Sequence, residues 1–558
     1  MDNQRLLLFV VFSFSILLLW ESWQEKDAPP VSPGMETSQT ASQPSASQPN
    51  NADVPAAAAT TAQAPQPTGS LQSGARAVVK TDVLEIEIDA NGGDLRRARL
   101  PGYFEVDHPE QTLTLLTDAG SGKRYVAQSG LLNAQKGLLP THKDVFELAG
   151  GTYQLAGDSL SVPLVWNNPQ AGIRVEKTYV FRRGSYEVEL IQKVVNSGAT
   201  PVQVESYAQL VRHGQPPEGE SKFMYTFTGP AVYTDAAKFQ KLAFDDIADG
   251  DVEFQKSAKD GWVGMLQHHF VSAWLPRPGA DRQYFAEKID ADLYSAGYRQ
   301  PHGTVAPGQS LDLTSRLYVG PQVQEMLETA APGLDLTRDY GWLTPIAAPM
   351  FWALEKIHAM VGNWGWAIVI FTILLKLALW PLSASGYKGM AQMRALAPRL
   401  QKMKELYGDD RQKLHQAMAE MYKKEKVNPL GGCMPILLQI PIFIALYYVL
   451  IAAVEMRGAP WLGWITDLSA PDPLYILPVL MGISSIIQVK LNPTPPDPLQ
   501  AKIMMAMPIV FSVMFIFFAS GLVLYWLVNN ILSIAQQWAM NKKYGEGAGA
   551  KPAHATKK

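Results

Sequence analysis

The sequence predicts a polytopic α-helical membrane protein with six transmembrane helices, a large β-sandwich domain outside the membrane and a cytoplasmic helical hairpin. Three observations predict this fold class. The chain begins with an apolar run, its middle region alternates apolar and polar residues with the period of strands, and five apolar runs of helical length follow. The formal net charge of −3 over 558 residues hides a net acidic first part and a net basic second part.

The first segment, residues 1–23, is expected to remain as a transmembrane signal anchor. It contains the run LLLFVVFSFSILLLW, and no small-residue cleavage site follows this run. The acidic flank behind the run favours an N-terminus in the cytoplasm. Residues 24–74 are rich in Pro, Ala, Ser, Gln and Thr, so we expect a disordered tether. The single cysteine, Cys433, excludes an internal disulfide.

Residues 75–335 carry the strand signals of the predicted β-sandwich. Val83–Asp89 alternates and ends in a turn at Asn91–Gly93, while Lys177–Leu190 is typical of a hairpin about Gly184. Further strands are expected within 202–211, 262–274 and 310–319. Many short strands separated by turn signals indicate one large sandwich.

This region contains no pattern that indicates catalysis. Gly120–Lys123 lacks the spacing of a phosphate-binding loop. His268 and His269 are neighbours, and on one strand their side chains would point to opposite faces, which favours a structural pair over a metal site. We therefore expect a binding or docking domain.

Residues 336–362 predict an amphipathic helix that lies in the outer interface of the membrane, because Pro, Glu, Lys and His interrupt its apolar run. A loop packed on the sandwich is the alternative. Residues 363–540 predict a core of five helices. The expected spans are Trp364–Leu382, Met434–Val454, Leu474–Leu491, Ile503–Phe518 and Gly521–Trp538.

The charges of the connecting segments predict the topology. Segment 383–428 carries ten basic and five acidic residues, and the tail 541–558 carries five and one. Loop 455–473 carries one basic and three acidic residues. Positive loops stay in the cytoplasm, so the first two lie inside and the third outside. Segment 383–428 shows helical spacing on both sides of Gly408–Asp410, which predicts a hairpin with a basic surface for a nascent chain, the ribosome or anionic lipid.

Polar residues gather in the cytoplasmic halves of the predicted spans. A charge at the depth of Lys376 costs about 3 kcal/mol unless it faces water or reaches the headgroups. A transporter would place polar groups at the midplane, so the one-sided pattern predicts a hydrated groove open to the cytoplasm. The candidate groove residues are Lys376, Thr372, Gln439, Ser484, Gln488, Ser512, Trp526, Asn529, Asn530 and Ser533. Two alternatives remain: Lys376 snorkels to the headgroups, or the polar groups only join helices by hydrogen bonds.

Seven stretches of the second half resemble the YidC/Oxa1/Alb3 membrane protein insertases, in the six-span form of Gram-negative bacteria. They are Val361–Gly365, Lys376–Leu382, Glu425–Cys433, Gln439–Phe443, Ala445–Tyr448, Asp467–Ser469 and Ser520–Trp526. The cation of the groove in this family is usually arginine. Lys376 keeps the charge but lacks the planar, two-pronged donor.

The resemblance implies a periplasmic β-supersandwich with a cleft and an insertase of the inner membrane whose two termini are cytoplasmic. It implies a membrane insertase and chaperone that releases client segments sideways into lipid, alone or with the Sec translocon and its accessory subunits. The implied partners are nascent inner-membrane proteins, membrane lipids and the ribosome, which the basic tail and hairpin would contact. No cofactor, metal, DNA partner or covalent chemistry is expected. A secondary transporter that couples through Lys376 and an anchored sugar-binding enzyme are the other classes considered.

Overall fold

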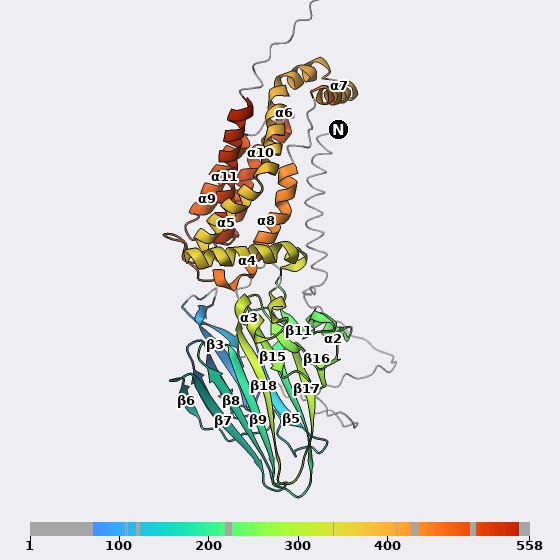
Figure 1. Cartoon of the computed structure of the whole chain (residues 1–558), viewed down its shortest axis with the longest axis vertical. Coiled ribbons are helices and arrows are strands. Elements are labelled where there is room, and N and C mark those ends of the chain that lie inside the picture. Colours follow the sequence, from blue (N-terminus) through green and yellow to red (C-terminus); the bar gives the residue numbers. More distant parts are fainter. Residues whose placement is uncertain are drawn as a thin grey trace, which may run out of the picture. The chain divides into compact units, whose positions relative to one another are not determined.

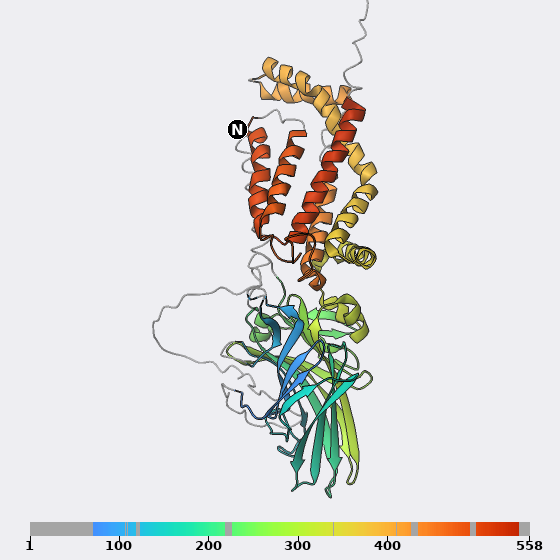
Figure 2. The ribbon, with the colours of Figure 1, turned by 90° about the vertical axis from the view of Figure 1, so that its left-hand side faces the viewer.

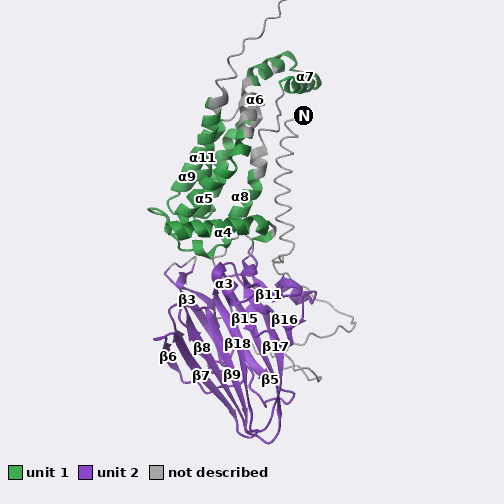
Figure 3. Ribbon diagram, in the orientation of Figure 1, with its two compact units in different colours: residues 1–15, 339–558 green, residues 16–338 purple. Residues whose placement is uncertain are grey.

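The computed structural model describes residues 71–545 except 106–107, 109, 119–122, 218–225, 339, 409, 426–433 and 492–497. The predicted anchor, nearly all of the tether, most of the basic tail and Cys433 therefore lie outside the described residues. The chain divides into two compact units (Figure 3). Residues 16–338 form one unit, whose described part is mostly sheet, and residues 339–558 with 1–15 form the other, whose described part is helical.

The sheet unit contains a ten-stranded sheet (Figure 1). Its strands pair antiparallel except at one edge, where the short strand β6 runs parallel to β1. In spatial order the strands are β13 (Ser257–Ala258), β16 (Arg282–Asp290), β17 (Leu293–Val305), β10 (Val202–His213), β5 (Tyr125–Leu132), β3 (Asp94–Phe104), β2 (Glu85–Asp89), β1 (Arg76–Lys80) and β6 (Gly151–Gln154), with β4 (Thr112–Leu116) beside β3.

An eight-stranded antiparallel sheet completes this unit. In spatial order its strands are β12 (Lys238–Lys241), β11 (Gly229–Thr234), β14 (Trp262–Leu266), β15 (Phe270–Pro276), β18 (Ser310–Pro321), β9 (Glu187–Asn196), β8 (Ile173–Arg182) and β7 (Ser159–Asn168). Helices α2 (Phe244–Asp249) and α3 (Gln324–Ala330) and a 3₁₀ helix at Leu334–Thr337 lie outside the two sheets.

The alternating pattern of the sequence explains the central hairpin of the second sheet. Along β9 every second side chain is buried, as a strand with one face on a core requires. Strands β8 and β9 pair with Phe181 opposite Val188, which confirms the hairpin predicted about Gly184. Gly184 has a φ of 68°, and its N–H donates to the Asp82 carboxylate at 2.9 Å. Glycine adopts this left-handed backbone without strain.

The two sheets pack face to face. A buried cluster joins Leu131 of β5 to Val175 of β8 and Val194 of β9. Beside it the buried Lys177 donates from Nζ to the backbone oxygens of Gly92, at 2.6 Å, and Ser129, at 3.0 Å. Burial lowers the pKa of Lys177 to about 8, although the nearby Asp94 acts in the opposite direction. The predicted large β-rich region is confirmed.

One strand prediction needs correction. Residues 262–274 form two antiparallel strands, β14 and β15, with Val263 opposite Trp274. His268 and His269 lie in the turn between them, so the argument from opposite faces of one strand was wrong. Their rings stack with centroids 3.9 Å apart, because the turn brings consecutive side chains together. No group of His, Cys, Asp and Glu among the described residues could hold a metal ion.

The second unit is a bundle of helices (Figures 1 and 2). It consists of α4 (Thr344–Val361), α5 (Trp364–Ala378), α6 (Trp380–Leu406), α7 (Arg411–Lys424), α8 (Met434–Ala452), α9 (Ile476–Leu491), α10 (Pro498–Met514) and α11 (Ser520–Gly545), with 3₁₀ helices at Gly341–Leu343, Val454–Met456 and Phe515–Phe517. Helices α6 and α7 form a hairpin at the end of the bundle that is distant from α4, as both views show. Asp410 caps α7 by accepting the Lys413 N–H at 3.1 Å.

The prediction that the apolar run from Trp364 to Leu382 forms one helix was wrong. Helix α5 ends at Ala378, and α6 begins at Trp380 after the non-helical residue Leu379. Pro381 has no N–H to continue the ladder of α5, whereas proline is tolerated in the first turn of a new helix. Trp380 therefore belongs to α6 and not to the helix that carries Thr372 and Lys376.

The loop that contains residues 460–472 packs against the end of the bundle at which α4 lies. Its residue Trp461 packs on Gly365 at the start of α5, and a Cβ at position 365 would lie 2.1 Å from the Trp461 ring. The Asn363 side chain caps α5 and donates to the Pro460 oxygen at 3.0 Å. Asp472 accepts the Trp464 Nε1–H at 2.9 Å. Among the helices within the described ranges, none combines the length and the apolar character needed to cross a membrane.

Candidate functional site

Helix α11 places polar side chains on two of its faces. Asn529 and Ser533 are four residues apart, so they lie on one face, one turn from each other. Asn530 is turned about 100° away from Asn529 and faces another neighbour. Asn529, Asn530 and Ser533 are all nearly inaccessible, at 7%, 3% and 2% exposure. Buried polar groups of this kind must find hydrogen-bond partners, and the two faces find different ones.

Lys376, in the last turn of α5, contacts the first of these faces. Its Nζ donates to Ser533 Oγ at 2.8 Å, and that hydroxyl donates to the backbone oxygen of Asn529 at 2.7 Å. No carboxylate of the described part of the chain forms an ion pair with Lys376. The ammonium group is therefore held by neutral oxygens, and its charge remains available to another acceptor.

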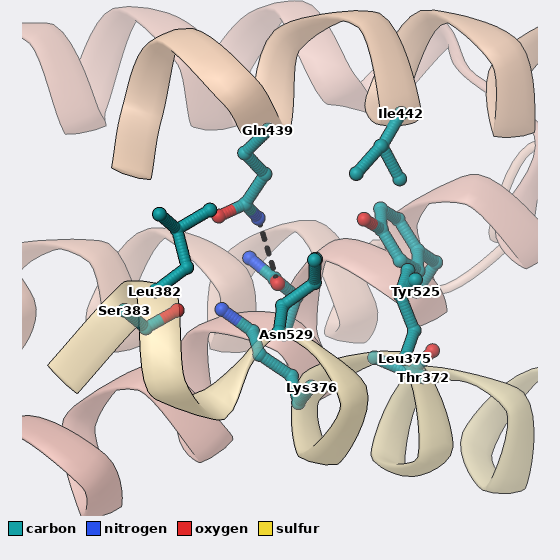
Figure 4. A pocket seen from close by; sticks show the side chains of 10 residues that line it. Thr372, Leu375, Lys376, Leu382, Ser383, Gln439, Ile442, Tyr525 and Asn529 are labelled. Carbon is teal, nitrogen blue, oxygen red and sulfur yellow. Dashed lines mark hydrogen bonds between the residues drawn. The ribbon is translucent and has the colours of Figure 1, made fainter. Parts of the chain in front are cut away.

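The same face of α11 meets α8 through two amides. Gln439 Nε2 of α8 donates to Asn529 Oδ1 at 2.8 Å (Figure 4). Both residues line a small pocket between α5, the start of α6, α8 and α11. The pocket lining consists of Thr372, Leu375, Lys376, Leu379, Leu382, Ser383, Gln439, Ile442, Tyr525 and Asn529. Thr372 is buried, and its hydroxyl donates to the Ile368 oxygen at 2.6 Å. Thr372 is therefore part of the wall of the pocket, and its hydroxyl hydrogen is already used.

Aromatic side chains pack beside the polar pocket. Trp526 of α11 meets Phe443 of α8 edge to face, with ring centroids 4.5 Å apart. Phe443 also stacks on Tyr525 at 6.3 Å, and Phe515 meets Trp526 at 5.4 Å. Trp526, which the sequence proposed for the groove, therefore belongs to an aromatic layer next to the pocket, and its neighbour Tyr525 lines the pocket itself.

The other predicted residues join helices. Asn530 Nδ2 of α11 donates to Ser484 Oγ at 3.1 Å and to Ser485 Oγ at 2.8 Å, both on α9. Ser512 Oγ of α10 donates to the Pro478 oxygen of α9 at 2.8 Å. These contacts match the alternative in which polar groups hold helices together. Gln488 is half-buried on α9 and has no hydrogen bond within the described residues.

The structure thus separates the ten candidates. Lys376, Thr372, Gln439 and Asn529 line the pocket, Ser533 accepts the hydrogen bond of Lys376, and Trp526 lies beside them. Ser484, Ser512 and Asn530 connect α9 to its neighbours, and Gln488 on α9 belongs to neither group. Tyr525 and Ser383 also line the pocket and were not predicted. A signal for Tyr525 existed, because it precedes Asn529 by four residues on one helix.

The side chains that line the pocket are suited to binding. The pocket offers an ammonium donor, two amides and one phenol within apolar walls. Such a set can hold hydrogen-bond acceptors and donors of a guest chain.

Comparisons with known proteins identify the family of the chain. Residues 76–353 match the family model of the YidC periplasmic domain, and residues 356–547 match that of the 60Kd inner membrane protein. A protein of Thiobacillus denitrificans named membrane protein insertase YidC is 61% identical over the whole of both chains. One of the same name from Aromatoleum aromaticum is 52% identical over 99% of this chain and 100% of the relative.

The solved structure of an active YidC insertase with its first transmembrane domain resolved aligns with 84% of this chain and 93% of that chain, at 19% identity and a TM-score of 0.41. The two family models and the two full-length relatives establish the family and its non-catalytic role. The chain belongs to the YidC family of membrane protein insertases, which are inner-membrane proteins with a periplasmic domain.

Proposed function

We propose that this insertase receives a nascent hydrophobic segment, with its polar flank, at the pocket between α5, α8 and α11. The segment then leaves sideways into lipid. The transfer is driven by burial of apolar surface, at about 25 cal/mol per Å². Lys376 attracts acidic groups of the flank, while the neighbouring polar side chains replace some of the water that the flank loses. The step needs no cofactor and breaks no covalent bond.

The observation that supports this proposal is the Lys376–Ser533 contact of 2.8 Å. A snorkelling lysine would extend away from the helices toward water. Here the side chain turns into the bundle and meets α11, in the same pocket as the Gln439–Asn529 pair. A cation that faces inward, without an acidic partner in the described residues, is suited to an acceptor that comes from outside the protein.

We further propose the placement of the chain in the membrane. The anchor and five apolar segments of the core form six spans, with both termini and the α6–α7 hairpin in the cytoplasm. The sandwich and its tether are periplasmic, and α4 lies in the outer interface. The basic excess of segment 383–428 over loop 455–473 supports this orientation.

A stalled nascent membrane protein should crosslink to the pocket. Photoreactive residues placed singly at Gln439 and Trp526 are expected to capture the client's hydrophobic segment and the flank that follows it. The readout is the mass shift of the client on gels, with chains of increasing length to follow entry.

The matched control is a probe at Leu374, a 52% exposed residue of α5. It lies two residues away from Thr372 and Lys376, on a part of the helix that does not line the pocket. Entry through the pocket predicts crosslinks at Gln439 in short chains and at Leu374 only in longer ones. Equal capture at both positions from the start would contradict a route through the pocket.

The cytoplasmic partner of the basic segments is proposed to be the ribosome. Lysines 542, 543, 551, 557 and 558 can contact RNA phosphates, and such contacts weaken as salt rises. Removing residues 541–558, of which 546–558 lie outside the described residues, should lower co-sedimentation with ribosomes severalfold and reduce the slope of binding against salt. A truncated chain that binds equally across the salt series would argue against this role. Sec subunits remain proposed partners of the periplasmic domain.

A further inference from the structure

The Gln439–Asn529 pair has unused hydrogen-bonding capacity. The hydrogen bond between them uses Nε2 of Gln439 and Oδ1 of Asn529, and the Gln439 amide also interacts with the Tyr525 hydroxyl. Within the described residues no hydrogen bond is assigned to Asn529 Nδ2 or to Gln439 Oε1, and neither atom is fully enclosed. Figure 4 shows the two side chains pointing toward one another from α8 and α11, with Lys376 beside them. The pair therefore offers the pocket one amide NH2 group as donor and one carbonyl oxygen as acceptor.

One donor and one acceptor are what a peptide unit requires. Every residue of an extended chain except proline carries one N–H and one C=O, and each costs free energy when it leaves water unpaired. The client's flank must pass the pocket before it can satisfy these groups in a helix. Because the main chain is the same whatever the side chains are, amides that pair with it would serve clients of unrelated sequence.

We propose that Gln439 and Asn529 bind the main chain of the client, with Asn529 Nδ2 donating to a backbone C=O and Gln439 Oε1 accepting a backbone N–H. This inference rests on the proposed function, and it adds the chemical group that is recognised. The neutral amides bind the main chain of the client whatever the charge of its side chains, whereas Lys376 responds to the charge of the flank. In the empty pocket the two amides share one hydrogen bond, which holds them in place and leaves Asn529 Nδ2 and Gln439 Oε1 open for the client.

The first test compares substitutions that differ only in hydrogen bonding. Gln439→Met and Asn529→Leu keep the approximate volume and remove the amide. Each is expected to lower the insertion rate about three- to tenfold, in line with one lost hydrogen bond of about 1 kcal/mol. The loss should be the same for clients with acidic, neutral and basic flanks. Loss confined to one flank charge would overturn main-chain recognition.

The matched control exchanges the two residues. Gln439→Asn combined with Asn529→Gln keeps both amides and the summed length of the two side chains. This double variant should recover insertion to within about threefold of the original chain. Insertion as poor as in the Met and Leu variants would show that the exact packing, and not the amide chemistry, matters at these positions, and would overturn the proposal.

The decisive test removes the backbone N–H from the client. A cell-free client carrying one backbone ester in the stretch captured by the Gln439 probe should insert more slowly than the all-amide client. An ester elsewhere in the flank serves as reference. The ester penalty should vanish in the Gln439→Met insertase, because the acceptor is already gone. An equal penalty in both insertases, or none in either, would overturn the proposal.

These outcomes are distinct from failure of the proposed function. If the Gln439 probe never captures a client, the pocket is not the route and the function fails. If capture persists while esters and amide substitutions have no coupled effect, only main-chain recognition fails.

Discussion

Lys376→Glu is expected to abolish most insertion of clients whose translocated flanks are acidic. The substitution places a carboxylate beside Ser533 and Asn529, where the ammonium group now lies. In a partly buried site two charges at close range interact by up to about 4 kcal/mol, and a change of about 1.4 kcal/mol already alters a rate tenfold. We expect a loss of at least tenfold for acidic flanks and a much smaller loss for neutral ones.

The other substitutions at this position should form a graded series. Lys376→Arg keeps the charge and reach and should insert all clients, while Lys376→Ala should fall between Arg and Glu because hydrophobic partitioning persists. The measurement is protease protection of inserted clients with flank charge varied in steps. Lys136→Glu, a charge reversal at an exposed position of the sheet unit, is the control and should have little effect. Equal insertion by the Arg, Ala and Glu variants would remove the electrostatic role of Lys376.

Gly365→Leu is expected to destabilise the helical unit and to reduce insertion of every client. A Cβ at residue 365 would lie 2.1 Å from Cδ1 and 2.2 Å from Cγ of Trp461, which no relaxation of the glycine itself can relieve. Overpacking of this kind costs about 1–3 kcal/mol or more. The expected result is a lower thermal midpoint of the purified protein in detergent, with a parallel loss of insertion.

A size exchange provides the control for Gly365. Trp461→Ala alone should destabilise, because it removes a large side chain that packs on α5. In the Gly365→Leu background the same substitution should stabilise, because it makes room for the new side chain. Such a change of sign identifies direct contact in a double-mutant cycle. If the losses of stability of the two single variants simply add in the double variant, the destabilisation does not come from a clash between residues 365 and 461.

The sequence predicted the elements well where periodicity was strong. The hairpin about Gly184 follows from alternation that β8 and β9 keep over ten residues each. The break at Leu379 was missed although Pro381 signalled it, because the run of apolar residues continued through it. The type of each element could be predicted from local sequence. The boundary between α5 and α6, however, depends on one residue, Pro381, which has no backbone N–H.

The candidate site could be predicted only in part, for a geometric reason. Asn529 and Asn530 are adjacent in sequence and equally polar, yet one lines the pocket and the other binds Ser484 and Ser485. Which face of α11 meets α8 and which meets α9 depends on the packing of the whole bundle. Polarity alone therefore found the helix that carries the site but could not separate the two functions of its faces.

The break between α5 and α6 has an electrostatic consequence for Lys376. The last carbonyl groups of a helix point along its axis without partners and carry a partial negative charge, equivalent to about half an electron. Since α5 ends at Ala378, Lys376 lies in its last turn, close to carbonyl groups that favour a nearby cation. Had the helix continued to Leu382, the ammonium would sit more than a turn from that negative end. Pro381, which is not among the residues that line this pocket, thus helps the protein keep a positive charge where the described residues supply no carboxylate.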